Sequence, residues 1–253
     1  MKILVINPNT TASMTDKIAA AARDIARPDT EIIAANSQDG PASIQGFLDV
    51  ATCIPGLLAE VSRHPDVDAI VIACFDDTGV DAVRTLVKVP VLGIGEAAYH
   101  VASMIANKFS VITTLARSVP GLESNLMRYG LDRKCARVRA TDIPVLKLEE
   151  GDPATLFKIR SEIRESIEHD NTEAIVLGCA GMADLMAQLS EEFGLPVIDG
   201  VAAGVTLAEA LVNNRLSTSK IGAYSADLWI FMSGVDCNTL DSGGIYRCHM
   251  LCF

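Results

Sequence analysis

Positive charge is scarce in this sequence: 21 Lys and Arg residues stand against 32 Asp and Glu residues, which gives a net charge of −11. An acidic protein of this kind has no electrostatic reason to bind nucleic acid or an anionic membrane. Long apolar runs are missing as well, since no stretch approaches the ~20 apolar residues of a membrane span. The opening apolar run 3–6 is far shorter than the core of a signal peptide. We therefore expect a cytoplasmic protein with neither nucleic acid nor a membrane as a partner.

Paired cysteines and metal-binding spacings are also missing. The cysteine count is odd, none of the cysteines forms a C-x-x-C pair, and the four histidines do not lie at metal-ligand spacings from them. In a chain of this size without a secretion signal, these absences argue against a disulfide scaffold and against a zinc site. We expect no bound metal. The seven cysteines are Cys53, Cys74, Cys135, Cys179, Cys237, Cys248 and Cys252.

What the sequence does contain is a regular alternation of short apolar runs and helical patterns, which predicts parallel sheets with helices on their faces. In the first half, strands are expected at 2–7, 30–36, 68–74 and 90–95, and helices at 11–26, 43–63 (with a kink near Pro55), 79–87 and 96–106. In the second half, strands are expected at 108–114, 136–143, 173–179 and 196–200, and helices at 118–130, 153–169, 181–193 and 201–214.

The two halves resemble each other. The stretch "VDAIVIACFDDTG" (67–79) is matched by "TEAIVLGCAGMAD" (172–184), and similar "PV" strands begin 16 residues after Cys74 and 17 residues after Cys179. We therefore predict an α/β fold of two pseudo-symmetric lobes, each a short parallel sheet flanked by helices, with an active-site cleft between them. The first lobe is expected to comprise 1–105 and about 205–225, and the second 106–204. The tail 226–253 breaks the alternation and is assigned neither structure nor function.

The matched cysteines suggest a reaction. Ligands of open parallel sheets bind beyond the carboxyl ends of the strands, where Cys74 and Cys179 both lie, so two facing lobes would place two thiols across one cleft. A thiolate on one wall can remove a proton from carbon while a thiol on the other returns one, which is a two-base racemisation. A cysteine pKa of ~8.5 makes some thiolate available near neutral pH, and the helix starts expected after both cysteines should increase that fraction. The other five cysteines do not share this position and are interpreted as structural.

Five motifs carry a family resemblance and occur in that family's order: "VINPNT" (5–10), "GPASIQG" (40–46), "ACFDDTG" (73–79), "VITTL" (111–115) and "LGCAGMA" (177–183). On these motifs the chain resembles the aspartate/glutamate racemase superfamily and, within it, the hydantoin racemases. The resemblance covers about residues 1–225. It implies cofactor-independent racemisation of 5-monosubstituted hydantoins, and the family habit implies a homo-oligomer.

The resemblance also implies roles for individual residues. Cys74 and Cys179 match the two catalytic cysteines. The C5 proton of a hydantoin is flanked by a carbonyl, so its removal gives an enolate-like anion that backbone N–H groups near both cysteines would stabilise. Each non-cysteine position also has a simpler reading as a turn, cap or strand residue. The implied substrate-binding residues are Asn7, Ser43, Phe75, Asp76, Thr113, Thr114, Gly178, Ala180 and Gly181.

Other substrates and functions stay open at this point. Aspartate and glutamate racemases typically carry Thr and then His or Glu after the second cysteine, whereas Ala180 and Gly181 follow it here. No Lys or Arg lies in 5–13, 73–82 or 177–184, and Asp76 and Asp77 would repel a dicarboxylate but tolerate a neutral hydantoin. These carboxylates should raise the pKa of Cys74, and one of them is expected to cap a helix. Allantoin racemisation, related isomerisations or decarboxylations, simple ligand binding and redox sensing remain alternatives.

Overall fold

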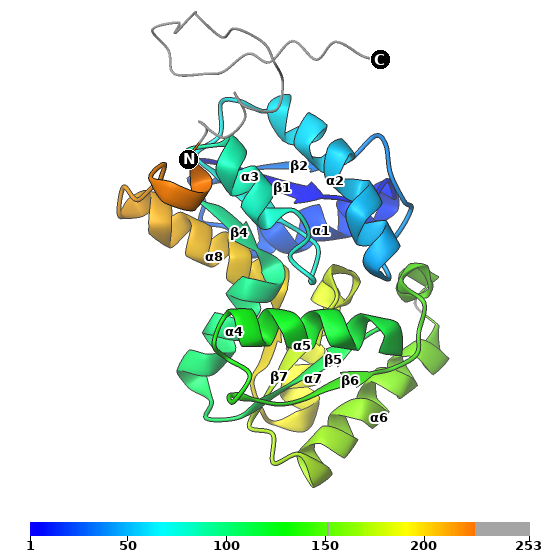
Figure 1. Cartoon of the computed structure of the whole chain (residues 1–253). Helices are drawn as coiled ribbons and strands as arrows, with labels where there is room; N and C mark the ends of the chain where they lie inside the picture. The colour runs from blue at the N-terminus through cyan, green and yellow to red at the C-terminus, as the bar shows by residue number, and fades with distance from the viewer. Residues whose placement is uncertain (151, 226–253) are drawn as a thin grey trace, which may run out of the picture.

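The computed structural model describes residues 1–150 and 152–225. The tail 226–253, to which the sequence analysis assigned no structure, lies outside the described residues. Two four-stranded parallel sheets stand one above the other, with helices on their faces (Figure 1). The first has the order β2-β1-β3-β4 and the second β6-β5-β7-β8, so the lobes share one topology, as predicted. The strands are β1 Lys2–Asn7, β2 Glu31–Asn36, β3 Ala69–Ile72, β4 Val91–Gly93, β5 Phe109–Thr113, β6 Cys135–Ala140, β7 Ala174–Gly178 and β8 Val197–Asp199.

The helices follow the strands in the order that the alternation predicts. Short 3₁₀ helices, η1 to η4, lie at Ala116–Ser118, Val145–Glu150, Ala180–Leu185 and Gly222–Tyr224. The α-helices are α1 Ala12–Ile25, α2 Phe47–Ser62, α3 Val80–Leu86, α4 Ile94–Ile105, α5 Val119–Arg128, α6 Pro153–His169, α7 Met186–Phe193 and α8 Gly200–Asn213.

Helices α4 and α8 join the two lobes, because each contacts strands of both sheets. Small residues let them approach closely: a Cβ on Gly200 would lie 2.7 Å from the carbonyl oxygen of Ile94, and one on Gly204 would lie 2.8 Å from Val71. The apolar core is continuous through this region, and its members include Val71, Ile94 and Val201. The expected lobe boundaries near residues 105 and 205 stay a prediction.

Three expected elements begin or end elsewhere in the structure. The helix expected from 43 starts at Phe47, because the chain reaches it through an extended Gly46, and it continues through Pro55. The strand expected over 90–95 ends at Gly93, where α4 takes over. The helix expected from 181 opens as the 3₁₀ helix η3 and becomes α-helical only at Met186. The differences at the start of α2 and at η3 lie beside the cleft, because Ile44 and Ala180 line the pocket.

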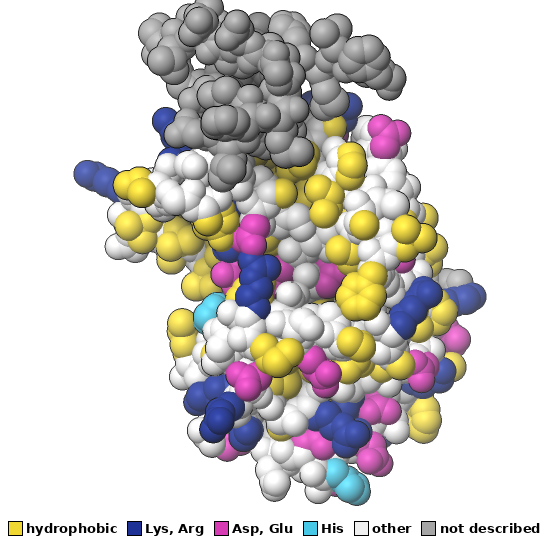
Figure 2. Space-filling view, in the orientation of Figure 1, with side chains coloured by type: hydrophobic (Ala, Val, Ile, Leu, Met, Phe, Trp, Pro, Cys, Tyr) yellow, Lys and Arg dark blue, Asp and Glu magenta, His cyan; other side chains and the backbone are white. Residues whose placement is uncertain are grey.

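The visible surface carries charged side chains of both signs. Figure 2 shows acidic and basic side chains interspersed over the visible face rather than gathered into a basic patch. None of the helices in the described part of the chain combines the length and apolarity that crossing a bilayer requires.

Candidate active site

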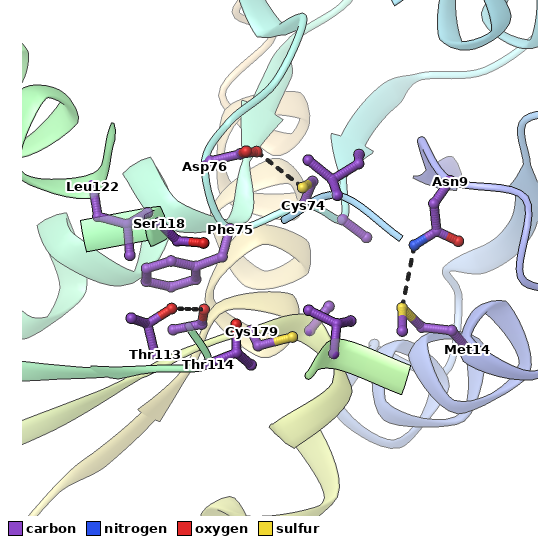
Figure 3. Close-up of a pocket in the computed structure, with 15 residues that line it drawn as sticks. Asn9, Met14, Cys74, Phe75, Asp76, Thr113, Thr114, Ser118, Leu122 and Cys179 are labelled. Carbon is purple, nitrogen blue, oxygen red and sulfur yellow. Dashed lines mark hydrogen bonds between the residues drawn. The ribbon is translucent and has the colours of Figure 1, made fainter. Parts of the chain in front are cut away.

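A pocket with a cavity of about 50 Å³ lies between the lobes at the carboxyl ends of β3 and β7. Cys74 and Cys179 project from opposite walls, as Figure 3 shows, so the structure brings the two predicted cysteines to one site. Phe75 and the two threonines lie toward one end of the pocket, and Asn9 and Met14 toward the other. The residues lining it are Asn9, Met14, Ile44, Ala73, Cys74, Phe75, Asp76, Thr113, Thr114, Ser118, Leu122, Val145, Gly178, Cys179 and Ala180.

Eight of the eleven predicted site residues belong to this lining, and three do not. The carboxyl ends of β3, β5 and β7 supply the eight. Strands β5 and β7 are neighbours that end at one edge of the second sheet, and the end of β3 belongs to the first sheet. The lining residues are Cys74, Phe75, Asp76, Thr113, Thr114, Gly178, Cys179 and Ala180, whereas Asn7, Ser43 and Gly181 lie outside it.

Asn7 is buried behind the pocket and supports a residue that lines it. Its side-chain amide donates to the Oδ1 of Asn9 at 2.9 Å and to the Oγ1 of Thr15 at 3.1 Å, and its own Oδ1 accepts from the N–H of Asn9 at 3.2 Å. These bonds fix Asn9, whose Nδ2 faces the sulfur of Met14 at 3.3 Å. Asn9 was present in the "NPNT" motif, but spacing alone does not show which asparagine faces the cleft.

Ser43 also lies behind a lining residue. It is 8% exposed, its hydroxyl accepts a hydrogen bond from the side chain of Gln45 at 2.5 Å, and its neighbour Ile44 is the residue that enters the pocket. The same loop reaches the other lobe, because the Ser118 hydroxyl donates to the carbonyl oxygen of Gln45 at 3.4 Å and Arg117 donates to the Gln45 side chain at 3.2 Å. The loop therefore closes one side of the cleft.

Cys74 has an acidic neighbour. Its thiol donates to the Oδ1 of Asp76 at 2.9 Å, and the same oxygen accepts from the N–H and hydroxyl of Thr78. Burial and then the negative charge of Asp76 hold the pKa of Cys74 well above its ordinary value, while the backbone N–H of Asp76 acts in the opposite direction. The expectation that the Asp76 carboxylate raises this pKa agrees with the structure.

Cys179 lies in a less charged environment. Burial raises the pKa of its thiol to about 11, while a hydrogen bond from the N–H of Gly181 lowers it. Gly181 thus faces the sulfur, and a Cβ at this position would lie 3.7 Å from Sγ and 3.2 Å from Leu148. In both lobes the N–H of the second residue after the cysteine approaches the thiol.

The backbone N–H groups after both cysteines lower the thiol pKa values in the expected direction, but they do not decide the net shift in the free protein. Helix α3 begins only at Val80, and a 3₁₀ helix separates Cys179 from α7, so neither thiol lies at the first turn of an α-helix. Burial, which disfavours the charged form, outweighs the single backbone N–H that each sulfur receives.

The threonines at the end of β5 differ in what they do. The Thr113 hydroxyl donates to the carbonyl oxygen of Gly178 at 3.0 Å, which ties β5 to the strand that carries Cys179. Within the part of the chain that the structure describes, the Thr114 hydroxyl makes no hydrogen bond, although Thr114 lines the pocket. Thr114 is therefore the one of the pair whose hydroxyl is available to a bound molecule.

Of the two aspartates after Cys74, Asp77 is the one that caps a helix. The helix is α4, which begins farther along the chain, and not α3, which follows the loop directly. Its carboxylate accepts hydrogen bonds from the N–H groups of Gly95 at 2.9 Å and Glu96 at 2.8 Å, at the start of α4. A third bond comes from the Tyr129 hydroxyl at 2.9 Å. Burial raises the pKa of Asp77 to about 8, and these donors oppose that rise. The segment after Cys74 is thus anchored to α4.

Gly95→Ala is expected to disrupt this anchor, because a Cβ on Gly95 would lie 2.2 Å from the carbonyl oxygen of Phe75 and 2.8 Å from Asp77. Forcing a methyl group against backbone costs about 1–3 kcal/mol of unfolding free energy, which urea titration can measure. Gly121→Ala in α5 is the matched control, since its nearest contact would be 4.0 Å away. This control should be neutral or more stable by up to about 1 kcal/mol, and equal losses in both variants would contradict the prediction.

The rest of the lining is apolar or neutral. Met14, Ile44, Leu122 and Val145 contribute side chains, and among the described lining residues Asp76 carries the only charged side chain. For metal binding, the described residues offer one group of three possible ligands, Glu165, Glu168 and His169, which lies exposed on α6 and outside the pocket lining. The pocket thus combines two thiols with neutral donors and apolar walls.

Comparisons with known proteins agree on one family. A family model described as Asp/Glu/Hydantoin racemase matches residues 3–208, which include both sheets and both cysteines of the pocket. The hydantoin racemase of Rhizobium meliloti is 48% identical over 227 residues, covering 89% of this chain and 94% of the relative. An allantoin racemase from Klebsiella pneumoniae is similar in structure, with 45% identity, a TM-score of 0.86 and coverage of 88% and 92% of the two chains. That from Pseudomonas fluorescens has 42% identity, a TM-score of 0.85 and coverage of 88% and 96%.

Proposed function

The chain belongs to the Asp/Glu/Hydantoin racemase family and is an isomerase of that family, and on this premise we propose that it racemises 5-monosubstituted hydantoins without a cofactor. The observation that carries the proposal is the placement of two thiols, Cys74 and Cys179, on opposite walls of one pocket. A carbon held between them has a base on one face and an acid on the other.

In the proposed reaction the thiolate of one cysteine removes the C5 proton of the hydantoin. The electron pair left on C5 delocalises onto the adjacent carbonyl oxygen as an enolate. The thiol of the other cysteine then gives its proton to the opposite face of C5, and the configuration is inverted. The two cysteines end in exchanged protonation states, so the next turnover uses them in the opposite order or follows a proton exchange with solvent.

Neutral donors in the pocket suit the developing enolate. Thr114 and Asn9 both line the cavity. We propose the Thr114 hydroxyl, the Asn9 side-chain amide and the backbone N–H groups of Phe75 and Ala180 as donors. Donors already oriented toward developing charge in a site with little water stabilise a transition state effectively. No cofactor is needed as an electron sink, because the ring carbonyl accepts the electron pair.

The lining favours a neutral ring with an apolar substituent. Met14, Ile44, Leu122 and Val145 offer apolar contact, and no Lys or Arg among the described lining residues is available to hold a carboxylate. An aspartate or glutamate would also meet the negative charge of Asp76 beside Cys74. Free amino acids are therefore the weakest candidates among the substrates considered.

Allantoin is the second candidate substrate, since it is a hydantoin with a ureido group at C5. The two solved structures described above are allantoin racemases at 45% and 42% identity, close to the 48% of the hydantoin racemase relative. The chemistry at C5 is the same for both substrates. The apolar lining is the feature that places allantoin second.

The test is the loss of optical rotation of one enantiomer of 5-benzylhydantoin, measured without pyridoxal phosphate or added metal and against an enzyme-free blank. Rapid decay to zero supports the proposal, and a faster decay with allantoin at equal concentration would reverse the order of the two substrates. Flat traces with both would reject hydantoin racemisation. Thiol titration under mild oxidant separates a redox sensor, whose cysteines would be lost as a disulfide, from a racemase whose thiols stay reduced.

We also propose that the protein is a cytoplasmic homo-oligomer. The oligomer is supported by large apolar side chains that are exposed on the surface, among them Phe47 (73% exposed) and Leu48 (76% exposed) at the start of α2. Large exposed apolar side chains are common where a second subunit binds. Light scattering coupled to gel filtration gives the mass directly, and a monomer mass would reject this part of the proposal.

A further inference from the structure

Helix α5 belongs to the second lobe, where it packs against β6, yet one face of it meets the loop that carries Cys74 in the first lobe. Four residues at helical spacing form this face: Leu122 and Asn125 within α5, and Ser118 and Tyr129, which flank its two ends. Ser118 and Leu122 line the pocket. The next two reach beyond it to the backbone and side chains that follow Cys74.

Both contacts are hydrogen bonds across the cleft. The Asn125 side-chain amide donates to the carbonyl oxygen of Asp76 at 2.8 Å. The Tyr129 hydroxyl donates to the Asp77 carboxylate at 2.9 Å. Consecutive residues of the Cys74 loop are thus held by Asn125 of α5 and by Tyr129, which directly follows α5 and lies about one helical turn further on.

The Cys74 loop needs such support because its backbone is strained. Asp77 has a φ of 56°, in the left-handed region that is unfavourable for a residue with a side chain, whereas Gly79, with a φ of 76°, adopts this region readily. The loop does not turn into α3 until Val80. In both segments the N–H of the third residue after the cysteine, Asp77 or Met182, donates to the cysteine carbonyl oxygen at 3.0 Å. The segment after Cys179 differs in that it continues directly into the 3₁₀ helix η3. The two cysteines are therefore supported in different ways.

We propose that Asn125 and Tyr129 are positioning residues that set Cys74 against Cys179 from the opposite lobe. The inference rests on the proposed function for its catalytic consequence, because only a two-base reaction needs both sulfurs at defined positions on either side of one carbon. The Cys74 loop takes its active geometry when the second lobe is in place. The Cys179 segment continues as the 3₁₀ helix η3, which packs against α1 and α8.

Tyr129→Phe tests the proposal, since it removes one oxygen and keeps the ring. Asn125→Leu is a second variant that removes the other donor at similar volume. Arg128→Gln is the control: Arg128 also bridges the lobes, by an ion pair with Asp81, but Asp81 lies on α3 rather than on the loop. All three are compared with the unaltered protein by thermal melting, by steady-state racemisation, and by site-resolved alkylation of Cys74 and Cys179 with iodoacetamide, read by mass spectrometry.

We expect both test variants to alkylate faster at Cys74, by about threefold or more, with Cys179 changed less than about 1.5-fold. We expect kcat to fall about tenfold while KM changes less than about twofold, because a misplaced base loses rate more than binding. Arg128→Gln should leave the ratio of the two alkylation rates unchanged. Equal changes at both cysteines, no change, or the same shift in Arg128→Gln would overturn the proposal.

The two readouts separate this inference from the proposed function. If the unaltered protein shows no racemisation, the proposed function fails, and the alkylation rates still decide whether α5 positions Cys74. If it racemises and Tyr129→Phe and Asn125→Leu behave like the unaltered protein, the inference fails alone. A lowered melting temperature with symmetric alkylation would indicate a purely structural role and would also reject it.

Discussion

Cys179→Ser is expected to lower kcat for racemisation by at least about a thousandfold, the range associated with losing a positioned general base. Serine fills nearly the same space, but its hydroxyl does not ionise at any pH at which the protein is folded, so it neither removes the C5 proton nor returns one efficiently. Polarimetry against an enzyme-free blank measures this loss. Cys74→Ser should have an effect of the same size, because each turnover uses both sulfurs.

The two serine variants should nevertheless differ in one respect. Each keeps one base, so each should still exchange the C5 proton of one enantiomer with solvent without inverting it, and the two variants should exchange opposite enantiomers. Proton NMR in D₂O, run separately on each enantiomer, shows this exchange. Cys53→Ser is the control, because this buried thiol donates to the carbonyl oxygen of Val50 at 3.4 Å and a hydroxyl can replace it. An active Cys179→Ser enzyme would rule out the two-base mechanism.

The value of kcat/KM is expected to rise about tenfold per pH unit between pH 7 and pH 9. The proton-abstracting form contains a thiolate. Burial raises the pKa of Cys179 to about 11 and holds that of Cys74 well above its ordinary value. Below such a pKa the thiolate fraction increases tenfold with each unit of pH, so activity is gained as the pH rises. At pH values where both thiols ionise, activity should fall again, because no thiol is left to donate a proton.

Initial rates of racemisation over this range, each corrected for the spontaneous reaction at the same pH, give the profile. A slope near one in the logarithmic plot is the expected result. A profile that is flat from pH 6 to pH 9 would mean that a thiolate is already formed near neutrality. In that case the backbone N–H groups of Asp76 and Gly181 would outweigh burial, contrary to the order of effects in the structure.

The sequence was most informative where one strand pattern occurs twice. A buried β-branched run that ends in cysteine places that cysteine at the carboxyl edge of a parallel sheet, so the approximate positions of Cys74 and Cys179 followed from periodicity. The threonines at the end of β5, Thr113 and Thr114, could be placed by the same reasoning. Local pattern was sufficient here because strand ends and sheet edges are fixed by short-range structure.

The contacts that could not be predicted from the sequence join residues that are far apart along the chain. Asp77 caps a helix that begins 17 residues later at Ile94, and Asn125 and Tyr129 reach the Cys74 loop from the other lobe. Neither contact has a local sequence signature. The exchange of roles between Asn7 and Asn9 was hidden for a related reason, since both stand in one turn and only the packing of Met14 and Thr15 decides which amide faces the pocket.

The carboxylate of Asp76 lies beside Cys74, so the two cysteines of the pocket are chemically unequal. This inequality affects the kcat and KM values of the two enantiomers. The Asp76 carboxylate is hydrogen-bonded to Cys74 and not to Cys179, so its negative charge disfavours a thiolate on Cys74 more than on Cys179. The two enantiomers, which need opposite thiolates, therefore meet protonation forms of unequal abundance. Two enantiomers have equal free energies in water, which forces the ratio kcat/KM to be identical in both directions. The inequality must therefore appear as kcat and KM values that differ by a common factor. Progress curves that start from the pure enantiomers at a high substrate concentration should therefore have different initial slopes and still reach the same racemic mixture.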